Sequence, residues 1–363
     1  MADVSFQRLL VTLTTKLKNH SLGLRGDVVI VKDVKHSKLS ACSNHIFDVS
    51  FLVAGMPQNW QLIFNPEHPL LAPDVIFDNK SFFPDIQLIE GFTAWNTRSD
   101  ECLVALITDL FEAYLKHQRS AILEYPQVKN SFEEFMKTTK FGSRCEIDIL
   151  KNGPGTFNDV IKLMISLDVN FSKLPPYLQP KNVGDNCCCL SFVFEPPNLS
   201  TIKPVLELSP AVEIALGGIS NLRIPPYGTS TLVSYTKKIS DLLENTVSDV
   251  IERYERRKSL IILLLSELNG SVIEYDTETF CEASFLLEVE GFHFILIVML
   301  SEQFPHEEPS IALQPIYQMS NHVHTMSVKD CTHDPHMSSE QILTYIRESV
   351  NKSLQEFKKN SLS

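Results

Sequence analysis

Four histidines and a cysteine lie close together in one stretch near the C-terminus, and these residue types are well suited to bind a metal. Imidazole nitrogens and thiolates are good zinc ligands, so a zinc site is one interpretation. Structural zinc sites usually use paired ligands at spacings of two to four residues, and a polar loop at 321–336 is the favoured interpretation. We expect no metal and no other cofactor. The five side chains are His322, His324, Cys331, His333 and His336.

Two of the eight cysteines are candidates for a nucleophile, because a thiolate attacks carbonyl and thioester carbons. Cys102 precedes leucines at 103, 106 and 110, a spacing typical of the buried face of a helix, which favours a core thiol. Cys331 is followed by the polar segment Thr332–His336. The sequence has no phosphate-binding loop, no serine-hydrolase elbow and no His-Glu-x-x-His motif. We therefore expect no catalytic residue.

Composition limits the classes of partner. The formal net charge is −12 and the sequence pI is near 5.4, which argues against direct binding to nucleic acid or to an anionic membrane. The one dense basic cluster, Arg253 to Lys258, alternates with glutamates, and we interpret it as a solvated helix face. No secretory signal is evident, so the cysteines are expected to be reduced. Among them, Cys187–Cys189 form a run that is expected to pack in a strand, with the outer two on one face.

A pattern of strand, spaced prolines and strand occurs twice. Trp60–Phe64 alternates like a half-buried strand, Pro69 and Pro73 follow, and Asp74–Phe77 forms a second short strand. Proline removes a backbone donor and fixes φ, so such a linker suits an exposed crossing between two strands. The second copy consists of Phe292–Val298, Pro305, Pro309 and Ser310–Leu313.

An amphipathic helix follows each copy, at Leu103–His117 and Glu340–Phe357. This order resembles the ubiquitin-conjugating enzyme core and its inactive UEV and RWD relatives. The expected fold class is α+β, with tandem UEV/RWD-like domains, each a helix, a four-stranded antiparallel meander and a helix. We expect a first UEV-like domain at 1–126, a divergent middle domain at 127–256 and a second UEV-like domain at 257–363. Separate helices are expected at Ile239–Tyr254 and Leu260–Leu268.

The resemblance to conjugating enzymes also predicts what an active member would need. Those enzymes place the thioester cysteine after the proline crossing, behind a His-Pro-Asn tripeptide whose asparagine supports the oxyanion. No such tripeptide precedes Cys102 or Cys331. The expectation is a protein that is not an enzyme, with an active ubiquitin-conjugating enzyme using Cys331 or Cys102 as the alternative.

Several stretches narrow the resemblance to one family, BRE (brain and reproductive organ-expressed). They occur in the family's order across nearly the whole chain, and the segment Ser209–Gly218 is the most specific. The stretches are Ala94–Asn96, Glu101–Leu103, Ser209–Gly218, Ile224–Tyr227 and Val272–Asp276.

That resemblance implies a non-catalytic scaffold of deubiquitinase complexes that cut signalling-type, non-degradative lysine-linked polyubiquitin. These are BRISC and the BRCA-A complex that acts at DNA breaks, in the cytoplasm and the nucleus. The implied partners are a JAMM/MPN⁺ deubiquitinase, an Abraxas-type MPN⁻ subunit and a von Willebrand A-like MERIT-type adaptor. The resemblance also implies retained ubiquitin binding, with no membrane and no direct nucleic-acid contact. A stand-alone ubiquitin receptor is a further alternative.

The C-terminal unit is the expected docking site for the MPN pair, and the first two units are expected to hold the adaptor. Not all of its apolar strand residues can point inward in a strand of period two. Those on the outer face would form an exposed apolar patch of the kind that marks partner sites. Truncation near Glu255 is expected to remove the MPN pair and to spare the adaptor. The candidate docking residues are Phe285, Phe292, Phe294, Ile295, Ile297 and Met299.

Overall fold

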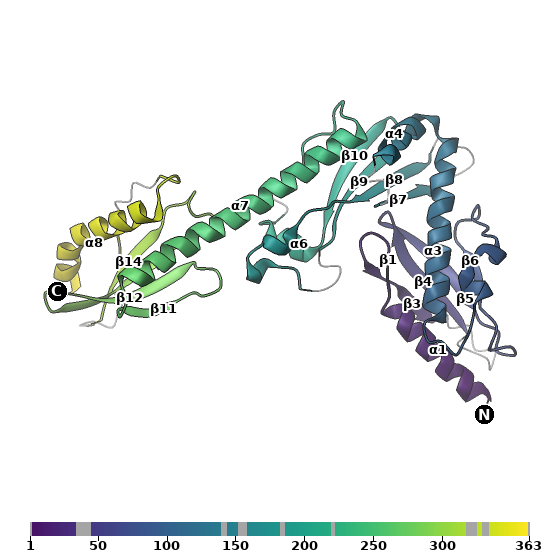
Figure 1. Cartoon of the computed structure of the whole chain (residues 1–363), viewed down its shortest axis with the longest axis horizontal. Coiled ribbons are helices and arrows are strands. Elements are labelled where there is room, and N and C mark those ends of the chain that lie inside the picture. The colour runs from purple at the N-terminus through teal and green to yellow at the C-terminus, as the bar shows by residue number, and fades with distance from the viewer. Residues whose placement is uncertain are drawn as a thin grey trace. The chain divides into compact units, whose positions relative to one another are not determined.

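The computed structural model describes residues 2–33, 45–138, 144–151, 158–181, 186–218, 222–316, 325–328 and 334–361. It is a mixed α+β structure built on antiparallel sheets, as the sequence predicts (Figure 1). The chain divides into two compact units. The first comprises Met1–Val169 and Pro180–Leu242, and the second comprises Asn170–Gln179 and Leu243–Ser363.

The first unit begins with a four-stranded antiparallel sheet in the order β3-β4-β5-β6. Helices α1 and α3 share one core with the inward side chains of this sheet, and Trp60 lies at its centre. This packing follows from the alternation along β4, where every second residue is apolar, buried and turned toward the helices. The bounds are α1 Ala2–Lys18, β1 Ser21–Leu22, β2 Asp27–Val28, β3 Ile30–Asp33, β4 Ile46–Val53, β5 Met56–Ile63, β6 Asp74–Phe77, the 3-10 helix Ile86–Leu88, α2 Glu90–Thr93 and α3 Cys102–Ala121.

A second four-stranded antiparallel sheet of the first unit has the order β10-β9-β8-β7. The sequence predicts a proline crossing as far as Pro204, whereas the structure continues strand β10 through this residue. Proline is tolerated there because β10 is an edge strand. The bounds are the 3-10 helix Ile122–Glu124, α4 Pro126–Lys137, β7 Cys145–Leu150, β8 Val160–Ser166, β9 Cys188–Glu195, β10 Thr201–Leu208 and α6 Pro210–Ala215.

The second unit holds a sheet of five strands, β11-β12-β13-β14-β15, one more than the expected four. The fifth strand pairs with β14 through only two residues, Met326 and Ser327. The C-terminal turns of α7 and the whole of α8 pack on one face of this sheet. The bounds are the 3-10 helices Phe171–Lys173 and Pro176–Leu178, β11 Val272–Tyr275, β12 Glu282–Val289, β13 Phe292–Met299, β14 Ser310–Pro315, β15 Met326–Ser327 and α8 Ser339–Ser361.

Helix α7, Leu232–Glu267, is a single helix of 36 residues, and its residues belong to both units. The expectation of two helices, separated between Tyr254 and Leu260, is therefore wrong. No glycine or proline interrupts that segment, so nothing in the backbone ends the first helix. The boundary expected between residues 256 and 257 falls inside α7.

Within the parts of the chain that the structure describes, no helix combines the length and the apolar character needed to cross a bilayer.

Candidate functional site

The structure divides the six predicted docking residues between the two faces of the C-terminal sheet. Phe285, Phe292 and Phe294 point into the core, where Phe294 and Phe292 each contact Phe357 of α8. These three phenylalanines are therefore unavailable to a partner. The other three, on strand β13, lie on the opposite face: Ile295, Ile297 and Met299.

The face turned away from α7 and α8 carries a continuous apolar band, which we call the outer stripe. Cross-strand pairing places Leu286 beside Ile295, and Ala312 beside Ile297. Leu286 and Met299 are 40% and 42% exposed, Ile295 and Ile297 are half-buried, and Ala312 is buried, although no stripe residue belongs to the described core cluster. An exposed apolar band on an otherwise well-packed sheet is typical of a protein-binding surface. The outer stripe consists of Leu286, Ile295, Ile297, Met299 and Ala312.

A second apolar surface lies in the first unit, on the segment that follows edge strand β6. Here a cavity of about 540 Å³ opens between β6, the following loop and Phe92. The side chain of Phe83 is 84% exposed and that of Ile86 is 60% exposed. We call this surface the β6 groove. Periodicity does not predict this groove, and the run Ser81-Phe-Phe-Pro84 is its one sequence signal: Phe82 is buried against Trp60, whereas the neighbouring Phe83 is exposed.

Cys102, the described candidate nucleophile, is the first residue of α3 and is buried against the core of the first unit. Burial raises the pKa of its thiol, which disfavours the thiolate needed for attack. Cys331 and most of the Cys/His loop lie outside the described residues. Over the described ranges, no three histidine, cysteine or acidic side chains are grouped as metal ligands.

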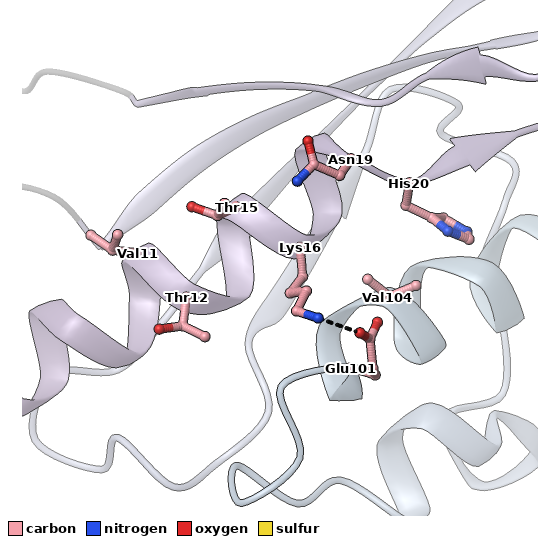
Figure 2. Close-up of a pocket in the computed structure, with 8 residues that line it drawn as sticks. All are labelled: Val11, Thr12, Thr15, Lys16, Asn19, His20, Glu101 and Val104. Atoms are coloured by element: carbon pink, nitrogen blue, oxygen red, sulfur yellow. Dashed lines mark hydrogen bonds and ion pairs between the residues drawn. The ribbon is translucent and has the colours of Figure 1, made fainter. Parts of the chain in front are cut away.

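A polar groove of about 550 Å³ lies between α1 and the start of α3 (Figure 2). Lys16 Nζ and Glu101 Oε1 form an ion pair of 3.0 Å across it, and this hydrogen bond raises the pKa of Lys16. His20 Nε2 lies 3.2 Å from Thr108 Oγ1. Both members of the ion pair are well exposed, so water screens their attraction. The groove is therefore a polar surface feature of the first unit with a solvent-exposed ion pair.

Two buried carboxylates on β7 join the two four-stranded sheets of the first unit, and neither is among the residues predicted from the sequence. Glu146 accepts hydrogen bonds from the backbone N–H groups of Leu24 at 2.7 Å and Ala54 at 2.8 Å. Asp148, two residues on and therefore on the same face, accepts from Gln58 Nε2 at 2.7 Å and Tyr114 Oη at 2.9 Å. The signal was the alternation of acidic and apolar residues in Cys145–Leu150.

Burial dominates the electrostatics of this junction. It raises the pKa of Asp148 to about 7, although hydrogen bonds from Tyr114 and Gln58 oppose the shift. It also raises the pKa of Glu146, against the two backbone N–H donors. Burial, together with the nearby Asp148, raises the pKa of the Tyr114 hydroxyl. A network of this kind fixes the position of one sheet against the other, because every carboxylate oxygen has a specific donor.

The chain matches the family model described as "Brain and reproductive organ-expressed protein (BRE)" over residues 8–319. A Branchiostoma floridae protein named "BRISC and BRCA1-A complex member 2" is 29% identical over 361 residues, which cover 96% of this chain and 94% of that protein. A Danio rerio protein of the same name is 29% identical over 280 residues, covering 76% of this chain and 72% of that protein.

Proposed function

This chain belongs to the BRE family, and from that premise we propose that it is a non-catalytic scaffold subunit of BRISC- and BRCA1-A-type deubiquitinase complexes. The observation that carries the proposal is the family match across residues 8–319, together with relatives named as members of those complexes. Its three parts are proposed to be UEV/RWD-like domains with the boundaries given above. In each, the fold of a ubiquitin-conjugating enzyme serves for docking.

The proposed role is to bridge an MPN-domain core, formed by a JAMM deubiquitinase and an Abraxas-type subunit, to a von Willebrand A-like adaptor. The outer stripe of the second unit supports docking of the MPN pair, because it is apolar, lies outside the described core cluster and exposes Leu286 and Met299. The β6 groove of the first unit supports docking of the adaptor. Ubiquitin contact and a location in both cytoplasm and nucleus are further parts of the proposal.

The absence of catalysis by this subunit rests on the chemistry of its thiols. Cys102 is buried, and burial raises its pKa. A conjugating enzyme needs an accessible thiolate and an oxyanion donor, and no His-Pro-Asn tripeptide precedes Cys102 or Cys331. The proposed contribution to ubiquitin-chain cleavage is therefore through assembly alone.

Reconstitution tests this role. The MPN pair and the adaptor are assembled with the wild-type chain, with a Cys102→Ser, Cys331→Ala double variant, or without the chain. Cleavage of signalling-type ubiquitin chains is then measured. We expect the double variant to match the wild type, and omission to lower cleavage and separate the adaptor from the MPN pair on gel filtration. A thiol-sensitive ubiquitin adduct on the wild-type chain, lost in the double variant, would instead identify a conjugating enzyme.

A further inference from the structure

The sulfur atoms of Cys187 and Cys189 lie 3.7 Å apart at the start of β9. Side chains two residues apart on a strand share a face, so the pair points to one side of the sheet and Cys188 points to the other. Cys188 and Cys189 are buried, whereas Cys187 is only partly buried. The pair therefore has one sulfur within reach of solvent and one behind it.

The pair sits in the small apolar cluster at the junction between the two sheets of the first unit. Cys189 packs with Ala54 and Met164, and Leu24 and Cys187 pack against the edge of this cluster. Leu24 and Ala54 are also the residues whose N–H groups bind Glu146. Chemistry at these sulfurs would therefore occur within the contact that positions the two sheets.

The surroundings of the two sulfurs shift the pKa values of their thiols in opposite directions. A hydrogen bond from Cys189, aided by the positive charge of Arg25, lowers the pKa of Cys187. The same hydrogen bond, together with burial, raises the pKa of Cys189. Burial raises the pKa of Cys188 to about 12. Cys187 is the sulfur within reach of solvent and is suited to attack, and the buried Cys189 behind it is suited to resolve the product.

We propose that Cys187 and Cys189 form a redox-active dithiol, which hydrogen peroxide converts reversibly into an intramolecular disulfide. The Cys187 thiolate attacks one peroxide oxygen and becomes a sulfenic acid, and hydroxide leaves. The Cys189 sulfur then attacks the sulfenic sulfur, and its thiol proton leaves with the hydroxyl group as water. The two sulfurs together supply the two electrons that reduce the peroxide. An added dithiol reverses the reaction by becoming a disulfide itself.

The geometry allows this bond and makes it easy to reduce. The sulfurs must approach from 3.7 Å to about 2.0 Å. Regular pairing with β10 begins at Cys188, opposite Leu208, and the Cys187 carbonyl accepts a hydrogen bond from the Ser209 N–H at 2.9 Å. The backbone of Cys187 is therefore held in place, and rotation of the two side chains must bring the sulfurs together. A disulfide between residues two apart is strained, and strained disulfides have the less negative potentials typical of labile, regulatory bonds.

Cys281 offers a matched comparison. It is also partly buried and free, but its thiol donates to the carbonyl of Thr279 at 3.8 Å and not to a second sulfur. Peroxide at Cys281 should therefore stop at an oxo acid or at a mixed disulfide with an added thiol. Only the Cys187–Cys189 pair should lose two hydrogens within one peptide.

Mass spectrometry of the intact, full-length chain tests the proposal. The reduced protein is treated with graded hydrogen peroxide, alkylated with iodoacetamide under denaturing conditions and digested with trypsin. Lys203 is followed by Pro204 and is not cleaved, so the tryptic peptide 182–223 contains all three adjacent cysteines and no other. We expect this peptide to lose two hydrogens and to carry one alkyl group, on Cys188. Treatment with dithiothreitol before alkylation should restore three alkyl groups.

Single-residue variants show which two cysteines form the disulfide. Cys187→Ser and Cys189→Ala should each abolish the two-hydrogen loss, whereas Cys188→Ala and Cys281→Ser should keep it. Cys187→Ser changes a partly exposed position, so it tests the pair even if Cys189→Ala disturbs the cluster. The proposal is overturned if the disulfide includes Cys188. It is also overturned if peptide 182–223 keeps three alkylated cysteines at peroxide levels that oxidise Cys281.

Discussion

Arg257 is a buried arginine on α7 that binds three acceptors in the second unit. Its side chain is 2% exposed, although the basic cluster around it is expected to be a solvated helix face. The guanidinium donates to the carbonyls of Thr279 at 3.1 Å and Glu302 at 3.0 Å, and to Tyr177 Oη at 3.3 Å. It therefore ties α7 to three separate segments of the second unit. The expectation of a solvated face is wrong at this position.

Replacing Arg257 with methionine tests this tie. The variant keeps much of the side-chain volume but removes the donor from two partly buried carbonyls, which should lower the free energy of unfolding by about 1–3 kcal/mol. Lys258→Met is the control, because the Lys258 side chain is 38% exposed, its ion pair with Glu255 spans 3.8 Å and its ammonium lies 5.8 Å from the Tyr254 ring centre, all weak contacts. Thermal unfolding followed by circular dichroism provides the measurement. Equal melting temperatures for the two variants would show that Arg257 is dispensable.

The aromatic residues show what could be predicted at this scale. The sequence predicts Trp60 in a half-buried strand, and it lies at the centre of the core, with T-shaped contacts to Phe51 at 4.6 Å and Phe77 at 5.1 Å. Trp95 is expected to open the helix, but α3 begins only at Cys102, and Trp95 is partly buried at the edge of the core. The alternating pattern of its strand predicts the burial of Trp60. The position of Trp95 depends on a loop, whose conformation has no periodic signal in the sequence.

At the scale of elements, β7 joins the two sheets of the first unit through Glu146 and Asp148. The pKa of Asp148 is raised from its usual value of 3.8 to about 7, so the folded state holds a proton that the unfolded state releases between these pH values. The contribution of Asp148 to the free energy of unfolding is fully present below about pH 4 and is lost as the pH rises through about 7. Its full span is about 4 kcal/mol.

Asp148→Asn should remove this pH dependence. The amide stays neutral and keeps an oxygen for Tyr114 or Gln58, so the variant should gain stability relative to the wild type as pH rises from 5 to 8. Urea unfolding at both pH values measures the difference. Asp168→Asn serves as the control, since that carboxylate is 85% exposed and pairs only with surface Arg144 among described residues. A difference between Asp148→Asn and the wild type that is the same at pH 5 and pH 8 would contradict the assignment.

Helices α2 and α3 approach each other closely at Gly91. A methyl group placed there would lie 2.4 Å from the Cα of Leu106, which is backbone and cannot rotate away. The Gly91 N–H also donates to Asp109 Oδ2 at 2.7 Å, so the same backbone position is fixed twice.

Gly91→Ala should therefore lower the free energy of unfolding by about 1–3 kcal/mol through overpacking. Thr93→Ala on the same short helix is exposed and should change stability by less than about 0.5 kcal/mol. Urea unfolding compares the two variants. If Gly91→Ala is as stable as Thr93→Ala, the crossing is looser than the structure indicates.

Much of the element order could be predicted from periodicity. The α+β class, the strands around both proline linkers and the amphipathic helices that follow them are confirmed. The continuous α7 could not be predicted with the same ease, because the change from polar to apolar residues after Tyr254 resembles the start of a new element. The junction carboxylates could not be predicted from β7 alone, since their donors lie on strands and helices distant in sequence.

On the scale of the whole molecule, the two apolar surfaces belong to different compact units: the β6 groove to the first and the outer stripe to the second. Truncation near Glu255 would cut through α7 and remove the last third of this helix, which packs on the sheet of the second unit. Surface substitutions separate the two roles without that damage. The family resemblance inferred from the sequence is confirmed by the match across residues 8–319.

A crossed binding experiment with the full-length chain tests the central proposal, that two surfaces divide the partners. The Leu286→Lys, Met299→Lys pair charges the outer stripe, and the Phe83→Ser, Ile86→Ser pair makes the β6 groove polar. All four residues are at least 40% exposed, so both variants should fold. Co-elution with the MPN pair and with the adaptor is measured by gel filtration. We predict that the stripe variant loses only the MPN pair and the groove variant loses only the adaptor; retention of both partners by both variants would contradict the account.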